Sequence, residues 1–354
     1  MPASAARPCI VVVGAGTMGA VHARLVAATD GVTLAGLCDP RPACEPLADE
    51  LGVPFATELE DLLRQAAPDA AIIATPNDTH ADAVEVCARR HVHCLVEKPI
   101  ADTRDAAARV VVAARQAGIH VLTGHHRRHS PRIAAARRVI DAGRLGTPTS
   151  FAALWLVTKP DDYFGYRWRT VRPGGGPVLI NLIHELDLMR YLYGEIAEVF
   201  AFANSGIRGW QVEDTVAITV RFASGSVGTI CASDTAAAPW SYELNAAENA
   251  LYQPADGDCY YLAGTTGSLA LPSLRLWSFP EDAPRGWDRA LREEEVPCEE
   301  GDPLVRQLAH FVQVISDTAL PLCSAQDGAR TLGAALAVLE SAERRQPVAL
   351  SADR

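Results

Sequence analysis

The chain has 354 residues, of which 49% are hydrophobic and 21% charged. A typical domain holds about 100–200 residues, so this length predicts about two domains with a substantial core and excludes a fibrous, disordered or disulfide-stapled miniprotein. With 32 Lys and Arg against 43 Asp and Glu, the formal net charge is −11. Nucleic acids and anionic membrane surfaces require a prominent positive field, so we expect neither as a partner. The remaining class is a globular protein that handles a small molecule.

The cysteine pattern and the length of the apolar runs indicate the cellular compartment in which the protein is expected. There are nine cysteines, an odd number, and they form no Cys-x-x-Cys pair, which predicts neither a disulfide framework nor a thiolate zinc site. No apolar run approaches the roughly 20 residues of a membrane helix. The run 9–13 is too short for a signal peptide, and Gly14 interrupts it. We therefore expect a cytoplasmic protein.

Short apolar runs and helical patterns alternate regularly over the first third of the chain. The predicted strands are 9–13, 33–38, 70–73, 93–96 and 119–122. The predicted helices are 18–28, 42–51, 80–90 and 103–117. Continuous apolar strands that alternate with helices are typical of a parallel sheet covered on both faces. Residues 1–124 are therefore predicted to form a doubly wound Rossmann domain of the α/β class.

The pattern changes after residue 124. Helices are predicted at 131–142, 181–193, 304–317 and 326–344. Strands are predicted at 149–157, 197–204, 215–222 and 226–233. Strands that follow one another without intervening helices indicate an antiparallel sheet. Residues 125–354 are therefore predicted to form a second domain, of the α+β class.

A glycine-rich turn joins the first predicted strand to the first helix. Its sequence, Gly14-Ala-Gly-Thr-Met-Gly19, fits the pattern G-x-G-x-x-G, in which glycines allow a tight turn and a close approach of backbone to a pyrophosphate. The N-terminus of the following helix adds free N–H groups and the positive end of a dipole. The alternative interpretation is an ordinary strand–turn–helix unit without a ligand.

The end of the second predicted strand favours the ligand interpretation. Asp39 stands there, about 20 residues beyond the glycines, where a carboxylate binds the ribose diol of NAD and repels a 2′-phosphate. NAD is therefore the predicted cofactor, and Arg41 keeps NADP open as the less favoured one. The predicted cofactor-binding residues of these two segments are Gly14, Gly16, Thr17, Met18, Gly19 and Asp39.

Two further segments follow predicted strands at the edge where open α/β sheets bind ligands. The segment 74–80 follows one strand, and Glu97-Lys98-Pro99 follows the next. A lysine is most often a solvated surface charge, but at this edge an ammonium can polarise a carbonyl or stabilise a developing alkoxide. We predict that Lys98 is catalytic and that Lys98–Pro99 is a candidate cis peptide bond.

These motifs resemble those of the Gfo/Idh/MocA oxidoreductases, the family of glucose-fructose oxidoreductase and inositol 2-dehydrogenase. The resemblance covers 14–19 with His22, 74–80, 97–99, 127–131, 174–184 and 339–342. It implies a second domain for substrate binding and oligomerisation, with a large, open, mostly antiparallel sheet that usually builds a homodimer or homotetramer, and C-terminal helices that pack back near the first domain. It also implies that the nicotinamide end of the cofactor site is lined by Thr75, Asn77, His80, Glu97 and Lys98.

A helical pattern begins at Asn181, after a run of glycines, and places Asn181 and His184 on one face. A single helical histidine is more often structural than catalytic. The resemblance nevertheless implies that His184 is the acid/base residue, which suits an imidazole that titrates near neutral pH. In the inositol dehydrogenase branch an Asp stands four residues earlier, where this chain has Ile180. Either His184 works without that carboxylate, or Asn181 supplies a substrate hydrogen bond instead.

Aromatic and arginine side chains precede the glycine run, between residues 159 and 172. They suit a sugar-like ligand or a carboxylate, and they suit a subunit interface equally well. Substrate contacts are predicted for Lys98, Tyr163, Arg169, Asn181 and His184. The His-rich segment 125–129 has no Cys or carboxylate partner at metal-ligand spacing, so we predict no metal site.

The sequence therefore predicts an NAD(H)-dependent oxidoreductase that acts on a secondary alcohol or ketone of a sugar, cyclitol or related polyol. Lys98 and His184 are expected to meet at the seam between the two domains. Ile180 favours, as an alternative, a dehydrogenase of cyclic dihydrodiols or similar less polar alcohols. A non-catalytic dinucleotide-sensing regulator is the alternative from another class, since some relatives in the family are corepressors, although a pure sensor would need neither Lys98 nor His184.

Overall fold

The computed structural model describes residues 7–282 and 284–350, and the chain forms two compact units. The first unit runs to His125 and includes Leu304–Leu332, and the second contains His126–Pro303 and the chain from Gly333 onward. The segment 304–332, which the sequence analysis assigned to the second domain, therefore packs with the first unit. The functional roles of the two domains remain predictions.

The first unit is built on a six-stranded sheet in which all neighbours are parallel. Its strands are β1 (Cys9–Val13), β2 (Thr33–Cys38), β3 (Phe55–Ala56), β4 (Ala70–Ile73), β5 (His93–Val96) and β6 (Val121–Thr123). Their spatial order is β3-β2-β1-β4-β5-β6. This order confirms the doubly wound Rossmann fold, whose ligand crevice lies at the carboxyl edge where the winding reverses.

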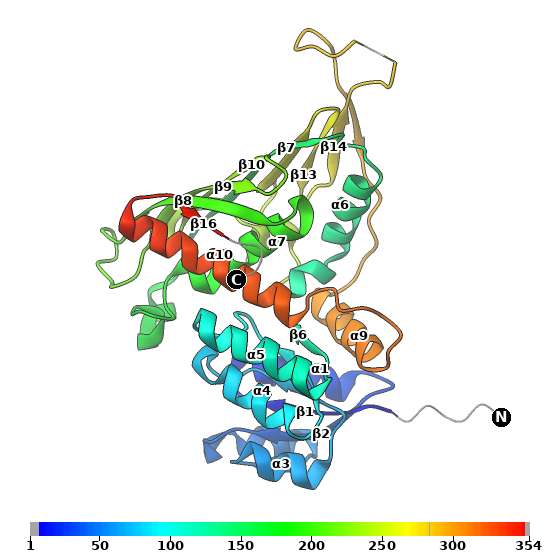
Figure 1. Cartoon of the computed structure of the whole chain (residues 1–354), viewed down its shortest axis with the longest axis vertical. Helices are drawn as coiled ribbons and strands as arrows, with labels where there is room; N and C mark the ends of the chain where they lie inside the picture. Colours follow the sequence, from blue (N-terminus) through cyan, green and yellow to red (C-terminus); the bar gives the residue numbers. More distant parts are fainter. Residues whose placement is uncertain (1–6, 283, 351–354) are drawn as a thin grey trace, which may run out of the picture. The chain divides into compact units, whose positions relative to one another are not determined.

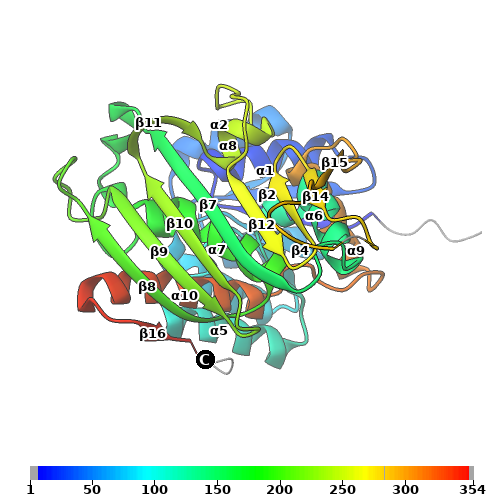
Figure 2. The ribbon, with the colours of Figure 1, turned by 90° about the horizontal axis from the view of Figure 1, so that it is seen from above.

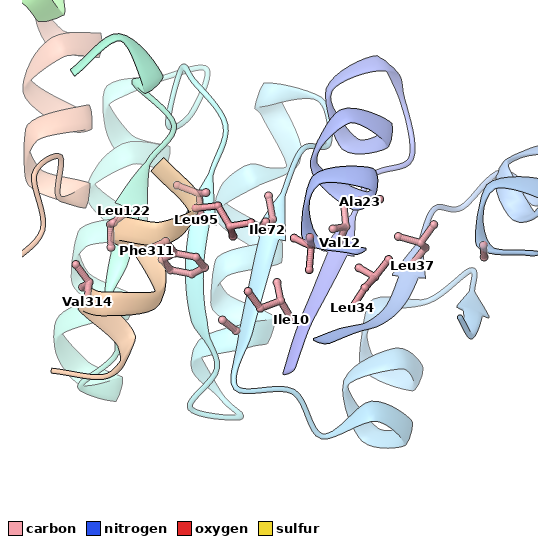
Figure 3. Packing of buried hydrophobic residues seen from close by; sticks show 14 residues of the cluster. Ile10, Val12, Ala23, Leu34, Leu37, Ile72, Leu95, Leu122, Phe311 and Val314 are labelled. Carbon is pink, nitrogen blue, oxygen red and sulfur yellow. The ribbon is translucent and has the colours of Figure 1, made fainter. Parts of the chain in front are cut away.

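Helices cover both faces of this sheet. They are α1 (Thr17–Ala28), α2 (Glu45–Leu51), α3 (Leu59–Ala66), α4 (His80–Ala88), α5 (Arg104–Ala117) and α9 (Pro303–Ile315). Figure 3 shows one side of the core, where Val12 of β1 lies beside Ala23 of α1, and Phe311 of α9 lies beside Leu95 of β5 and Leu122 of β6. Figure 1 shows α4 and α5 side by side against the sheet.

The apolar stripe of α9 explains why this late segment joins the first unit. Leu308, Phe311 and Val314 recur at helical spacing and are at most 2% exposed. Complete burial of one such side chain contributes about 1.5–3 kcal/mol, so the three together favour the packing of α9 on this sheet by about 4.5–9 kcal/mol.

The second unit contains a ten-stranded sheet. Its strands are β7 (Pro148–Thr158), β8 (Ile196–Asn204), β9 (Thr215–Phe222), β10 (Val227–Ser233), β11 (Thr235–Trp240), β12 (Tyr260–Gly264), β13 (Gly267–Leu271), β14 (Arg275–Ser278), β15 (Arg292–Glu295) and β16 (Val348–Ala349). The order is β15-β14-β13-β12-β7-β10-β9-β8-β16, and β11 pairs with β7. β7 and β10 are parallel, whereas the other pairs are antiparallel, so the sheet is mostly antiparallel as predicted.

Helices cover one broad face of this sheet and leave the other open (Figure 2). The covering helices are α6 (Pro131–Asp141), α7 (Ile183–Tyr193) and the later turns of α10 (Ala325–Arg344). Side chains alternate between the two faces along each strand. Trp155 of β7 is accordingly buried, whereas Phe202 of β8 points outward and is 62% exposed.

Among residues 7–282 and 284–350, no helix is both long enough and apolar enough to cross a bilayer.

Candidate functional site

Segments that follow four strands of the first sheet share one edge, because these strands are parallel. Gly14 follows β1, Asp39 follows β2, Ala74 follows β4 and Glu97 follows β5. This carboxyl edge is where a doubly wound sheet binds its ligand, beside the reversal between β1 and β4. The structure therefore brings the predicted cofactor residues together.

The glycine-rich turn leaves its backbone open to a ligand. Gly14 has a φ of +90°, and a Cβ there would stand 2.6 Å from the Ala74 carbonyl oxygen. A Cβ on Gly19 would stand 1.7 Å from the Gly14 oxygen. At Gly16 a Cβ would meet no atom within 4 Å, so the space in front of it is open. A pyrophosphate fits this cradle, with Thr17 and Met18 in the first turn of α1 beside it.

Hydrogen bonds hold Asp39 against the turn. Its Oδ2 accepts from the Ala15 N–H at 2.8 Å, and the Arg41 N–H and guanidinium donate to both carboxylate oxygens at 2.9–3.0 Å. Burial acts to raise the pKa of Asp39, but these donors outweigh it and lower the pKa to about 2. The carboxylate is therefore ionised at neutral pH, as recognition of a ribose diol requires. Sequence reasoning noted Arg41 but missed its ion pair with Asp39.

We expect Asp39→Ser to weaken NAD binding by about 10–100-fold, because charged hydrogen bonds are worth about 1.5–3 kcal/mol. Discrimination against NADP should also fall, since the substitution frees Arg41 to bind a 2′-phosphate. Titration calorimetry with both dinucleotides measures the two affinities. Asp30→Ser, at an exposed loop residue, is the matched control. An unchanged ratio of the affinities would contradict this role of Asp39.

Lys98 stands on a loop that is anchored to α1. The Nε2 of buried His22 lies 2.8 Å from Glu97 Oε1, and the Lys98 N–H donates to Glu97 Oε2 at 3.2 Å. The Lys98–Pro99 peptide bond is cis, as predicted. Glu97 is thus a link between the helix after the glycine turn and the half-buried Lys98. His22 appeared in the sequence only as part of the family resemblance, and its hydrogen bond to Glu97 was not predicted.

The segment after β4 is tied to the same loop through His80. The ring nitrogens of His80 lie 3.0 Å from the Pro99 carbonyl oxygen and 2.9 Å from that of Thr75. Burial lowers the pKa of His80, although hydrogen bonds to both carbonyls act to raise it. Asn77 lies half-buried in the short 3₁₀ turn just before it. His80 therefore holds the loop, and its predicted contact with nicotinamide stays a prediction.

In the second unit, Asn181 and His184 lie in one helical segment that starts differently from the prediction. A regular helix was expected from residue 181, but a π-helical turn, Val178–Leu182, comes first and α7 follows. The Val178 N–H donates to the buried Glu213 carboxylate at 2.9 Å. π turns insert one extra residue per turn and frequently mark functional sites. Asn181 therefore lies in the irregular turn and His184 in the regular helix.

Two adjacent arginines hold α7 through the carboxylates that follow His184, Glu185 and Asp187. Arg127 donates to Glu185 at 2.7 Å, and Arg128 makes two hydrogen bonds to Asp187 at 2.7 and 2.8 Å. All four charged side chains are buried, and breaking such a pair costs about 3–5 kcal/mol. The His-rich segment 125–129 thus serves to fix α7. Within the described ranges no group of three or more His, Cys, Asp or Glu residues could hold a metal ion.

Tyr163 and Arg169, the predicted substrate contacts, touch each other. The Arg169 guanidinium lies 4.0 Å from the Tyr163 ring centroid and donates to its carbonyl at 2.6 Å. Lys159, which sequence reasoning missed, lies 4.5 Å from the same ring centroid. Its Nζ donates to Asn181 Oδ1 at 2.8 Å. Lys159 thereby connects Tyr163 with Asn181, and His184 follows one turn later.

Comparisons with known proteins agree with this architecture. Residues 9–125 match the family model described as "Oxidoreductase family, NAD-binding Rossmann fold". Residues 133–270 match the model described as "GFO/IDH/MocA C-terminal domain". The two models together span most of both compact units.

Individual proteins are similar over nearly the whole chain. It is 29% identical over 309 residues to 1,5-anhydro-D-fructose reductase of Ensifer adhaerens, covering 84% of this chain and 87% of that protein. It is 26% identical over 361 residues to scyllo-inositol 2-dehydrogenase (NAD(+)) of Bacillus subtilis, covering 97% and 96%. The WlbA dehydrogenase of Bordetella pertussis in complex with NADH and UDP-GlcNAcA shares the fold, with a TM-score of 0.79, 21% identity and coverage of 98% and 99%.

Proposed function

The chain belongs to the GFO/IDH/MocA oxidoreductase family, and we propose that it transfers a hydride between NAD(H) and a secondary alcohol or ketone of a sugar, cyclitol or related polyol. One observation carries this proposal. The open glycine turn, the ionised Asp39 and the anchored loop of Lys98 all lie on the carboxyl edge of one doubly wound sheet. A dinucleotide bound there has its ribose at Asp39, and Lys98 stands two strands beyond the glycine turn.

Residues of both units have roles in the proposed reaction. When bound, NAD supplies the hydride acceptor. Lys98 donates to the reacting oxygen and stabilises the negative charge that develops on it. His184 takes the hydroxyl proton during oxidation and returns it during reduction. Further substrate contacts are proposed for Tyr163, Arg169 and Asn181. Contacts to the nicotinamide end are proposed for Thr75, Asn77, His80 and Glu97.

A thermal-shift screen followed by turnover assays tests the proposal. NAD and NADP are compared first, and sugars, cyclitols, sugar acids and an aryl dihydrodiol are then added to the dinucleotide-loaded protein. We expect NAD to raise the melting temperature more than NADP, because a ligand stabilises the folded state by mass action. We also expect at least one polyol to give NADH absorbance.

Other outcomes of the screen separate the alternatives. Turnover of the dihydrodiol above every polyol would replace the proposed substrate class by less polar alcohols. Stabilisation by NAD without turnover of any compound would contradict the enzyme and favour a dinucleotide-sensing regulator.

The open face of the second sheet supports a homodimer or homotetramer. Phe202, Val227 and Tyr261 point outward on this face and are 62%, 53% and 47% exposed. Exposed apolar patches on sheets commonly mark contact surfaces. Light scattering is expected to give the mass of at least two chains. All nine cysteines are free thiols, which supports a reducing, cytoplasmic compartment.

A further inference from the structure

The loop between β8 and β9 is longer than a hairpin requires. A two-residue turn is enough to join two antiparallel strands, whereas this connection runs from residue 205 to residue 214. It places two large apolar side chains at the surface, since Ile207 is 71% exposed and Trp210 is 42% exposed. Long loops that carry exposed apolar side chains commonly form binding surfaces.

Hydrogen bonds fix the conformation of this loop. The buried Asp214 carboxylate accepts through Oδ2 from the N–H groups of Ile207 and Arg208 at 2.9 and 3.0 Å. The Arg208 side chain donates to the carbonyl oxygens of Lys159 and Asp234 at 3.0 and 2.7 Å. The loop is therefore ordered before any ligand arrives, and a preorganised surface loses less entropy when it binds.

Trp210 and Ile207 form the apolar side of a pocket in the second unit. Its volume is about 370 Å³, which is within the range of small-molecule sites. The other residues that line it are polar: Thr158, Lys159, Asp161, Arg208 and Thr235. The pocket therefore offers one aromatic wall together with several hydrogen-bonding groups.

The charges around this pocket balance one another. Lys159 Nζ lies 3.9 Å from Asp234 Oδ2, and Arg208 Nε donates to Asp234 Oδ1 at 2.8 Å. Arg208 also lies 3.7 Å from Asp161, whose carboxylate is fully exposed and thus open to a ligand. Two cations and two carboxylates are paired here, so an ionic ligand finds no net opposite charge. Ammonium and guanidinium groups only donate, whereas a carboxylate accepts, so both kinds of hydrogen-bonding group are present.

A neutral sugar ring matches this set of groups. Each of its hydroxyls can both donate and accept, and its apolar C–H face can pack on the face of an indole. An apolar ligand would cover the charged groups without giving them hydrogen bonds, which is unfavourable. The pocket is therefore better suited to a neutral polyhydroxyl ring than to an ion or an apolar compound.

Lys159 connects the pocket with the helical segment of the proposed reaction centre. It lines the pocket, and its Nζ donates to Asn181 Oδ1 at 2.8 Å. Asn181 lies one helical turn, about 5 Å, before His184. A molecule of two sugar rings is long enough to span a lysine side chain and one helical turn.

We infer that this pocket binds a second, neutral sugar ring of the substrate, so that the enzyme acts on disaccharides or other glycosides in preference to free monosaccharides. This inference rests on the proposed function and names its substrate class. The reacting ring lies at His184. The second ring lies in the pocket, with its C–H face on Trp210 and a hydroxyl that donates to Asp161.

Binding of matched disaccharides and monosaccharides tests the pocket. The pairs are cellobiose and D-glucose, trehalose and D-glucose, and lactose and D-galactose, each titrated calorimetrically into the NADH-loaded full chain. For at least one pair we expect the disaccharide to bind about tenfold more tightly, because its second ring gains the indole contact and a hydrogen bond. Trp210→Ala should abolish this gain, whereas Trp210→Phe should keep part of it because an aromatic ring remains. Asp161→Ala should reduce the gain by the loss of one hydrogen bond.

Trp287→Ala is the matched control, because Trp287 is fully exposed on another loop of the second unit, and this variant should keep the whole gain. Equal binding within every pair, or a gain that survives in Trp210→Ala, overturns the pocket as a sugar site. If Trp210→Ala changes the mass in light scattering but no sugar affinity, Trp210 belongs to a subunit contact and the inference is wrong. NADH absorbance reports hydride transfer separately. A disaccharide gain without turnover contradicts the proposed function alone, and turnover without that gain contradicts this inference alone.

Discussion

Replacing Lys98 by alanine is expected to lower kcat by about 10²–10³-fold, the loss usual on removal of one preorganised donor to a developing oxyanion. The affinity for NAD should stay nearly unchanged, because the phosphates and ribose are proposed to bind at the glycine turn and Asp39. The loop itself should keep its place, since Glu97 is held by His22 and the Pro99 carbonyl by His80. The substitution therefore separates chemistry from cofactor binding.

Steady-state rates with a substrate found in the screen, together with calorimetric titration of NAD, measure the two effects. Arg109→Ala is the matched control, because Arg109 is a half-exposed cation of the same unit, paired with Glu85 and Asp82. Its kcat should equal that of the wild type. Lys98→Arg keeps the charge but replaces the compact ammonium with a planar fork, so it should recover little of the lost rate. A Lys98→Ala enzyme with the wild-type kcat would remove Lys98 from the reaction.

The first sheet could be predicted because its strands are continuous apolar runs buried on both faces. β1 and β4 agree with the predicted ranges 9–13 and 70–73 for this reason. β3 and α3 were missed. A strand of two residues, Phe55–Ala56, is too short to show any period, and α3 buries only Leu62 and Leu63.

The second sheet could be predicted only where its strands alternate regularly. β9 agrees with the range 215–222, since every second side chain from Val216 to Phe222 is buried. β11 contains a proline and pairs irregularly with β7, and β15 is an edge strand of charged residues, Arg292–Glu295. The parallel pairing of β7 with β10 depends on segments far apart in the chain, so no local pattern could reveal it.

Parts of the candidate site could likewise be predicted from local sequence, and other parts could not. The glycine turn, Asp39 and Lys98 could be predicted because each follows its strand directly in the sequence. The π turn before α7 could not, since the residues of Val178–Leu182 suit an α-helix equally well. The contact of Lys159 with Asn181 bridges 22 residues of irregular chain, and only the folded structure brings the two side chains together.

Replacing His184 by asparagine is expected to lower kcat by about 10²–10⁴-fold, the range for loss of a general acid or base. The pH profile is the sharper readout. Oxidation of an alcohol requires the neutral imidazole, so kcat/KM for the wild type should fall on the acid side of the profile, where this ring becomes protonated. The variant should lose this acid limb. His126→Asn replaces the ring that packs edge-on against His184, with centroids 5.1 Å apart, and should keep the limb with a much smaller loss of rate.

A His184→Asn enzyme that is slow but keeps its acid limb would assign the proton transfer to another group. Within the same helical segment that group cannot be Asn181, because an amide has no basic nitrogen and its oxygen already accepts from Lys159. It cannot readily be Glu185 or Asp187 either, since both carboxylates are buried in ion pairs with Arg127 and Arg128. Each of these neighbours is committed to a partner that fixes its position. The arrangement therefore makes His184 the group of this segment whose loss should change how the rate depends on pH.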